Sequence, residues 1–353
     1  MTNNNQRSTV LIIVNSDIRA GIQVSLNQYV TDLEEIEGYD VIVDDINVSS
    51  PEELKTHILN QYDLLSSSNP LAGCVLIGDL PVPWFGFTER YPLDSFYMDL
   101  HGDWGTDDNG EIVSIPNRII PEIWIGRLTA GPLSGVEVEL INNYFIKNHE
   151  YRTGQLNVMD RAMVYVDEDW VNKGDYGLSY AYEDVTVVND VATTDAADYK
   201  NKLADNYELI QVAVHSSARA HNFKNNNAWA GSVTNTDILN INPQPVFYCF
   251  DACKAARYTE NDYIGGCYIF SRGHGLAVIG ETQNANSMDG PSEFYSLFGE
   301  GLSLGESFIK WLNYGGRAKY HKDRTILGDP TLKRQSEYIS ESPAAPSDLR
   351  IVS

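Results

Sequence analysis

The 353-residue sequence contains no long apolar run. No stretch approaches the roughly 18 consecutive apolar residues that a transmembrane helix requires, so we expect no membrane span. The first residues, Met1 to Thr9, also lack the apolar core of a signal peptide. These features by themselves leave the compartment open.

Basic side chains are scarce, because 25 Lys and Arg residues stand against 49 Asp and Glu, a formal net charge of −24. A surface of that sign repels nucleic acids and anionic membranes, and it attracts cations, including basic peptide segments. We therefore expect no nucleic-acid partner. The excess of acidic residues can equally serve only to keep the protein soluble.

Cysteines are few, and the four present are Cys74, Cys249, Cys253 and Cys267. No Cys-x-x-Cys pair or histidine cluster has the spacing of a zinc site. In one extended segment the Cα atoms of Cys249 and Cys253 would lie roughly 13 Å apart, too far for a disulfide. The chain is therefore not a disulfide scaffold. Its one Gly-x-Ser-x-Gly match, Gly301-Leu302-Ser303-Leu304-Gly305, lies between two expected helices and not after a strand, which argues against an α/β-hydrolase that uses serine.

The composition, with 42% hydrophobic and 11% aromatic residues, is that of a globular protein. Buried strands are expected at 9–15, 40–43 and 73–77, with helices between them. The same order of strand, helix, short strand, helix and strand returns over residues 161–214. We interpret this recurrence as two related α/β units packed side by side.

These patterns divide the chain into three parts. The first unit covers residues 8–155 and the second covers residues 156–334. Residues 335–353 turn polar and then Pro-rich, which is typical of a linker, here expected to lead toward a further module.

Two reactive side chains follow neighbouring apolar runs of the second unit. His215 comes directly after the run 209–214, and Cys253 lies just past the run 246–250. In an open parallel sheet, chemistry gathers beyond the carboxyl ends of the strands, so the imidazole and the thiol are expected to share one crevice. This predicts a cysteine nucleophile with a histidine base, although both could simply be packing residues.

Three other residues compete for these roles. Cys249 lies inside the apolar run and is expected in the core, and His274 is expected in a turn. His221, in a polar segment, could line the pocket or be exposed. Between His215 and Cys253 we expect a polar, Asn-rich connection with one short helix at 235–240.

The segment 99–111 is rich in carboxylates, Gly and Asn, a composition that can wrap a calcium ion with oxygen ligands. Its spacing misses the EF-hand pattern, and a merely solvated turn is the alternative. The candidate ligands are Asp99, Asp103, Asp107 and Asp108.

Six stretches in order resemble gingipain-type cysteine peptidases of the caspase-like clan. The resemblance spans about residues 8–334 and is carried by Val212-Ala213-Val214-His215, Phe247-Tyr248-Cys249-Phe250-Asp251-Ala252-Cys253, Leu76-Ile77-Gly78-Asp79, Pro121-Glu122-Ile123-Trp124-Ile125-Gly126-Arg127, Leu276-Ala277-Val278-Ile279-Gly280 and Leu327-Gly328-Asp329-Pro330-Thr331-Leu332. It implies two tandem caspase-like α/β/α subdomains with mostly parallel sheets, of which only the second is catalytic.

The resemblance also implies roles for individual residues. Cys253 would be the nucleophile and His215 the acid/base, and the backbone N–H groups of Cys253 and Ser216 would form the oxyanion hole. The clan usually has glycine after the histidine, and a serine cannot adopt every glycine conformation. The geometry at Ser216 is therefore the point at which this chain departs from the pattern.

Gingipains cleave after Arg or Lys, so the resemblance implies a protein or peptide substrate and an acidic specificity pocket. The candidate acids are Asp167, Asp169, Glu281 and Asp289. No organic cofactor is expected, calcium is a candidate ion, and a secreted or cell-surface location is favoured. The alternative is a catalytically inactive homologue that binds calcium or proteins, suggested by Ser216 and by Lys254 beside the presumed nucleophile.

Overall fold

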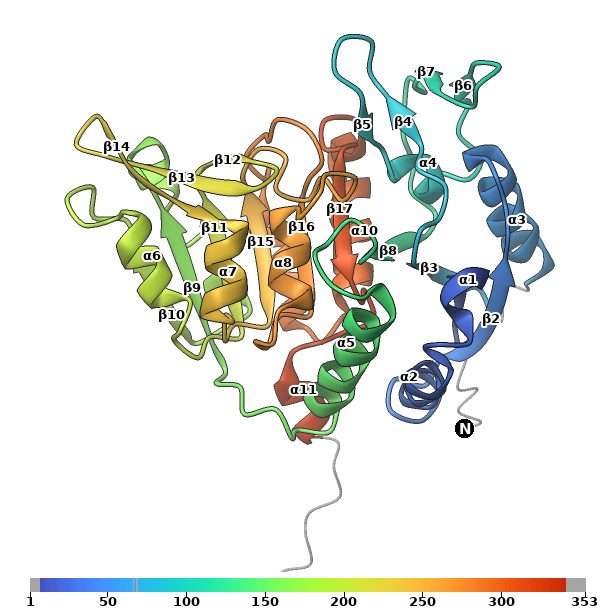
Figure 1. The fold of residues 1–353 in the computed structure, drawn as a ribbon, viewed down its shortest axis with the longest axis horizontal. Helices are drawn as coiled ribbons and strands as arrows, with labels where there is room; N and C mark the ends of the chain where they lie inside the picture. The colour runs from blue at the N-terminus through green and yellow to red at the C-terminus, as the bar shows by residue number, and fades with distance from the viewer. Residues whose placement is uncertain (1–6, 66, 68, 341–353) are drawn as a thin grey trace, which may run out of the picture.

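The computed structural model describes residues 7–65, 67 and 69–340. Its centre is a ten-stranded sheet with the order β10-β9-β11-β15-β16-β17-β8-β3-β1-β2. Helices α7 and α8 lie in front of this sheet in the view of Figure 1, and α10 lies behind it. The predicted α/β class with mostly parallel strands is confirmed.

The first half begins with β1 (Thr9–Asn15), α1 (Ser16–Arg19), α2 (Gln23–Glu35), β2 (Asp40–Ile46), α3 (Pro51–Leu64) and β3 (Leu71–Ile77). Helix α3 starts where the sequence predicts, because Ser50 accepts the backbone N–H of Glu53 and Pro51 occupies the first turn. β1 is buried along almost its whole length and pairs in parallel with β2 and β3.

A small four-stranded sheet, β5-β4-β7-β6, joins β3 to the next strand of the main sheet. It comprises β4 (Trp84–Phe85), β5 (Tyr91–Pro92), β6 (Gly105–Thr106) and β7 (Ile112–Ser114), with helix α4 (Ser95–Met98) between β5 and β6. The chain then enters β8 (Trp124–Leu128) and helix α5 (Glu137–Arg152).

The second half repeats the strand order of the first. β9 (Arg161–Val166), β10 (Asp184–Val188), β11 (Leu209–Ala213) and β15 (Phe247–Asp251) lie in the order β10-β9-β11-β15, as β1, β2, β3 and β8 lie in the order β2-β1-β3-β8. Helix α6 (Ala196–Lys202) precedes β11 as α3 precedes β3. Where the first half has α2, the second has only the 3₁₀ turns η1 (Glu168–Lys173) and η2 (Leu178–Tyr180).

The two halves share one continuous sheet through β17 (Arg324–Gly328). This strand pairs antiparallel with β16 (Ala277–Glu281) and parallel with β8. The strands of the two halves therefore run in opposite directions, and the carboxyl edge of the second half meets the amino ends of β17 and β8.

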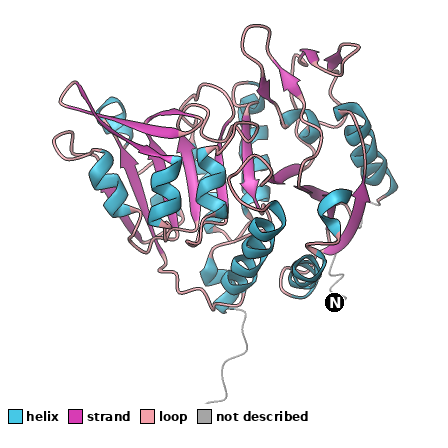
Figure 2. Ribbon diagram, in the orientation of Figure 1, coloured by secondary structure: helices cyan, strands magenta, loops and turns pink. Residues whose placement is uncertain are grey.

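The connection between β11 and β15 differs from the predicted polar loop. It forms a three-stranded antiparallel sheet of β12 (His215–Ser217), β13 (Ala220–Asn225) and β14 (Ala228–Thr234), followed by α7 (Asn235–Ile241). Asn226 and Asn227 both have positive φ, 50° and 60°, which suits a tight hairpin turn. Figure 2 shows this sheet across the carboxyl ends of the second half's strands.

The remaining helices pack around the second half and the seam. They are α8 (Ile264–Phe270), α9 (Pro291–Gly299), α10 (Leu304–Asn313), the 3₁₀ turn η3 (Tyr314–Lys319) and α11 (Gln335–Ser340). No helix of the described residues is long and apolar enough to cross a membrane.

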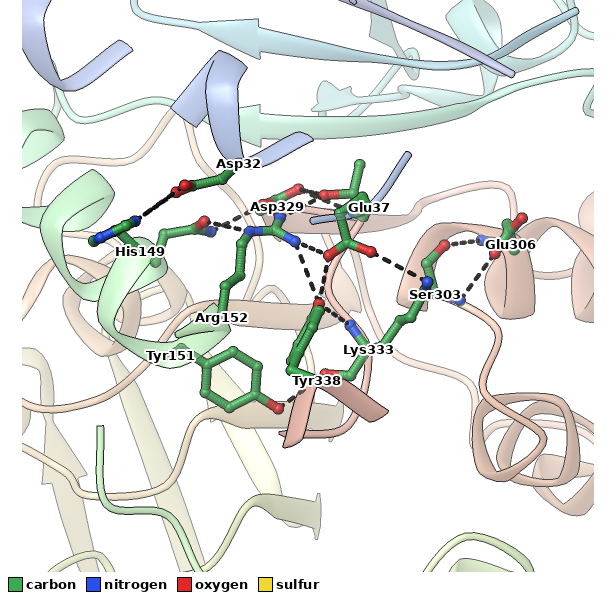
Figure 3. A network of polar contacts seen from close by, with 12 residues as sticks. Asp32, Glu37, His149, Tyr151, Arg152, Ser303, Glu306, Asp329, Lys333 and Tyr338 are labelled. Carbon is green, nitrogen blue, oxygen red and sulfur yellow. Dashed lines mark hydrogen bonds and ion pairs between the residues drawn. The ribbon is translucent and has the colours of Figure 1, made fainter. Parts of the chain in front are cut away.

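A buried polar network ties α11 to both halves (Figure 3). Arg152 forms ion pairs with Glu37 of the first half and Asp329 of the second, and the hydroxyl of Tyr338 donates to Glu37 at 2.6 Å. The first residues of the predicted linker thus belong to the folded body, whereas residues 341–353 lie outside the described residues.

Candidate active site

The carboxyl ends of β11 and β15 lie beside each other. These strands pair in parallel, with Val212 opposite Phe250 and Ala213 opposite Asp251. His215 and Cys253 each follow the last paired residue by two positions, and adjacent strands are about 4.8 Å apart. The register therefore carries both residues to the same edge of the sheet.

His215 is held from several directions. Its Nε2 lies 2.6 Å from the Asp169 carboxylate, and its ring makes edge contacts with the indoles of Trp170 and Trp229, with centroid distances of 5.0 and 5.4 Å. Asp169 also pairs with the Lys224 ammonium at 2.9 Å. Hydrogen bonds from His215 and Lys224 lower the pKa of Asp169, so this carboxyl stays ionised. An Nε2–H donated to Asp169 leaves Nδ1 as the free base of the imidazole.

Cys253 is the accessible thiol of the four. It is half-buried, whereas Cys74, Cys249 and Cys267 are buried. Burial raises the pKa of both Cys249 and Cys267 to about 12, which makes them poor nucleophiles. The expectation that Cys249 belongs to the core is thereby confirmed.

The sulfur of Cys253 accepts a hydrogen bond from a neighbouring loop. The backbone N–H of Ala285 points at Sγ across 3.3 Å. Ala285 belongs to the loop between β16 and α9, which reaches around Cys253 from the side opposite His215's hairpin.

The two backbone N–H groups expected in the oxyanion hole, those of Cys253 and Ser216, have different surroundings. None of the described residues accepts the backbone N–H of Cys253. Ser216 lies in extended strand β12, so its backbone does not need a glycine conformation. The positive φ instead falls on Lys254, at 59°.

The buried side chain of Arg324 connects the ends of strands β15 and β16. Arg324 at the start of β17 pairs with Asp251 at 2.7 Å and with Glu281, and it donates to the carbonyl of Asn286 at 3.2 Å. The N–H of Met288 donates to Asp251 at 3.0 Å. The loop that carries Ala285 is therefore anchored to the ends of β15 and β16.

Glu281 does not fit its predicted role in substrate binding. Its carboxylate is already paired with the guanidinium of Arg324, so it is not available to a basic side chain of a substrate. The reason is that the sequence predicts a strand at 276–279, whereas β16 extends two residues further, so Glu281 lies in the seam between β16 and β17.

The other predicted substrate-binding acids have distinct surroundings. Asp167, at the end of β9, is buried and accepts the N–H groups of Asp169 and Lys224, and burial raises its pKa to about 6. Asp169 pairs with His215 as described above. Asp289 is 77% exposed and faces Arg317 of η3 at 3.7 Å.

Two further residues are located by the structure. His221, which the sequence left open, packs in the core with its ring against Phe250 and Tyr268, and burial lowers its pKa to about 3. The role of Asp169 beside His215 is one that sequence analysis missed. Asp169 lies in η1 and His215 begins β12, 46 positions further along the chain.

The predicted calcium ligands occupy mixed positions. Asp99 is buried, which raises its pKa to about 6, whereas Asp103, Asp107 and Asp108 are exposed. The Asp107 carboxylate caps its own turn by accepting the N–H groups of Asn109 and Glu111. Across the described ranges no three His, Cys, Asp or Glu side chains gather in a way that could hold a metal ion. Calcium binding stays a prediction.

Comparisons with known proteins identify the family to which this chain belongs. The family model of peptidase family C25 matches residues 3–335. A solved structure described as "Structure of Protease" shares the fold, with a TM-score of 0.65 and 16% identity over 95% of this chain and 79% of that one. No curated protein matches the chain. Because the family model spans nearly its whole length, the chain belongs to peptidase family C25, a family of cysteine peptidases.

Proposed function

We propose that the chain is a cysteine endopeptidase in which Cys253 is the nucleophile and His215 the acid/base. The observation that carries this proposal is the shared carboxyl edge of β11 and β15, which carries both the half-buried thiol and an imidazole oriented by Asp169. The remaining three thiols are buried and cannot meet a peptide.

The reaction follows from these groups. Nδ1 of His215 accepts the thiol proton, and the sulfur of Cys253 attacks the carbonyl carbon of the peptide. The N–H groups of Cys253 and Ser216 donate to the oxyanion that forms. His215 returns its proton to the leaving amine, which leaves a thioester on Cys253. A water molecule, deprotonated by His215, then releases the carboxylic acid and restores the thiol.

We further propose that the enzyme cleaves after Arg or Lys and that Asp167 recognises the basic side chain. Asp167 lies next to the end of β11, two residues before His215, because its backbone N–H donates to the carbonyl of Ala213 at 3.2 Å. Unlike Asp169 and Glu281, it forms no ion pair with a cationic side chain of the described residues. A guanidinium or ammonium would compensate the charge that burial disfavours.

Cleavage assays on wild type, Cys253→Ala and Cys267→Ala test the proposal. We expect Cys253→Ala to abolish cleavage of peptides that contain Arg or Lys, and iodoacetamide to inactivate wild type in step with alkylation of Cys253. Cys267→Ala, which removes a buried thiol, is the matched control and should remain active. Full proteolysis by Cys253→Ala would refute the assignment.

The preference for basic residues and the calcium prediction are tested with the same enzyme. Two peptides that differ only in carrying Arg or Gln at the cleaved position should differ in KM, with the lower KM for the Arg peptide. Assays and thermal unfolding with and without EDTA test calcium, and an unchanged activity and unfolding temperature would contradict it.

A further inference from the structure

A hairpin of the first half reaches the loop that presents Cys253. The turn between β4 and β5 lies beside the loops above β15 to β17 (Figure 1). Its Glu89 carboxylate contacts the Lys254 ammonium at 2.7 Å and the Arg257 guanidinium at 2.6 Å. The side chain of Glu89 is 43% exposed, that of Lys254 26% and that of Arg257 9%. One carboxylate of the first half thus pairs with two cations of the catalytic loop.

The residue held in this way has an unfavourable backbone conformation. Lys254 directly follows Cys253 and has a φ of 59°, in the left-handed region that a residue with a long side chain rarely adopts. At this point the loop turns back onto β16, because the N–H of Lys254 donates to the carbonyl of Gln283 at 2.8 Å. Such strain persists only where the surroundings fix it.

Three anchors hold Lys254. Its carbonyl accepts the backbone N–H of Arg257 at 3.1 Å, and the Arg257 side chain in turn pairs with Glu89. The backbone N–H is bound to Gln283, in the loop that also carries Ala285 toward the Cys253 sulfur, and the ammonium is bound to Glu89. If the side-chain anchor is lost, Lys254 can relax to negative φ. That rotation turns the peptide plane between Cys253 and Lys254 and shifts both the sulfur and its N–H.

We propose that Glu89 is a positioning residue of the active site. It holds Lys254 in the left-handed conformation and thereby aligns Cys253 with His215 and with its own oxyanion-binding N–H. The inference rests on the proposed role of Cys253. The first half lacks a histidine or a cysteine at the equivalent strand ends. Through Glu89 it would nevertheless contribute to the catalysis that the second half carries out.

Kinetics of four variants test this inference. Because an exposed ion pair contributes only modestly, we expect Glu89→Gln to lower kcat about three- to tenfold with a smaller change in KM. Glu111→Gln, which breaks the Arg90–Glu111 ion pair (2.5 Å) beside the same small sheet and leaves the pairs of Glu89 with Lys254 and Arg257 in place, is the matched control and should keep wild-type kcat.

The decisive comparison is between Lys254→Ala and Lys254→Gly. Both remove the ammonium, but only glycine adopts a φ of 59° without strain. We expect Lys254→Ala to lose kcat as Glu89→Gln does, and Lys254→Gly to retain several-fold more activity than Lys254→Ala. The rate of Cys253 alkylation by iodoacetamide should follow the same order, and thermal unfolding confirms that each variant is folded.

Each outcome decides a separate point. If Glu89→Gln keeps wild-type kcat while Cys253→Ala is inactive, the positioning role is wrong and the peptidase proposal stands. Equal activity of the alanine and glycine variants at position 254 refutes the conformational explanation. An equal loss in Glu111→Gln shows a general weakening of the first half and also overturns the inference. Activity in Cys253→Ala overturns the inference together with the proposed function.

Discussion

Replacement of Arg324 by methionine tests the buried charge cluster below the active site. Arg324, Asp251 and Glu281 have side chains that are at most 1% exposed, and the guanidinium compensates both carboxylates. Methionine keeps much of the apolar stem but removes the charge. Breaking a buried pair in this way costs about 3–5 kcal/mol, because the remaining charges stay buried without a partner.

The expected shift in the melting temperature follows from the size of the chain. Unfolding entropy is roughly 2.1 cal/mol/K per residue, so for 353 residues it is about 0.7 kcal/mol/K. A loss of about 4 kcal/mol therefore lowers Tm by about 5 °C. Differential scanning calorimetry of wild type and Arg324→Met measures this shift directly.

The pH dependence separates the charge effect from a packing defect. Burial raises the pKa of Glu281 above its usual value, and Arg324 opposes that rise. Without Arg324 this opposition is lost, the folded-state pKa of Glu281 rises further, and the folded state binds the proton still more tightly than the unfolded state does. The destabilisation is then complete above the folded-state pKa and decreases as the pH falls through it. The Tm difference should thus be larger at about pH 8 than at about pH 5.5, nearer the usual carboxyl range.

A compensating variant completes this test. Glu281→Gln and Asp251→Asn in the Arg324→Met background remove the unpaired charges, and they should restore most of the lost Tm. A loss that is the same at both pH values, or that the added substitutions leave unchanged, would mean that the cost comes from packing and would refute the electrostatic explanation.

Three further predictions concern the site and the seam. Asp169→Asn should lower kcat roughly 10- to 100-fold, because an amide can favour the wrong tautomer of His215; a wild-type pH–rate profile would contradict this role. For peptides with Arg at the cleaved position, KM should rise as the pH falls below about 6, where Asp167 becomes protonated, and Asp167→Asn should abolish that pH dependence; an unchanged KM in the variant would exclude Asp167. Tyr338→Phe, which removes a donor to buried Glu37, should cost about 1–3 kcal/mol in urea unfolding, and a neutral effect would show that α11 is not held by this contact.

Local signals in the sequence predicted much of the fold. The Ser50 cap and Pro51 set the start of α3, and the sequence pattern also predicts a helix at 304–313, where α10 (Leu304–Asn313) lies. Because His215 and Cys253 directly follow apolar strands, the rule for parallel sheets sufficed to expect them at one edge. These features depend only on residues close together in the chain.

Features that depend on distant pairing were not predicted. The placement of β17 beside β8 joins residues about 200 positions apart, and the contact of Asp169 with His215 requires the turn η1 to lie against β13. The strands β12 to β14 were missed because their polar composition resembles a loop. A weak signal was present, since His221 and Phe223 alternate with more exposed residues along β13.

The placement of β17 has a consequence for synthesis of the chain. The strands of the first half are complete at Leu128, yet the edge of β8 gains its partner only when Arg324–Gly328 has left the ribosome. Until then the nascent first half presents an open strand edge of the kind that pairs with other chains and aggregates. Fragments that end before residue 324 should therefore be prone to self-association. In the complete chain, β17 covers the open strand edges of β8 and β16 at the same time.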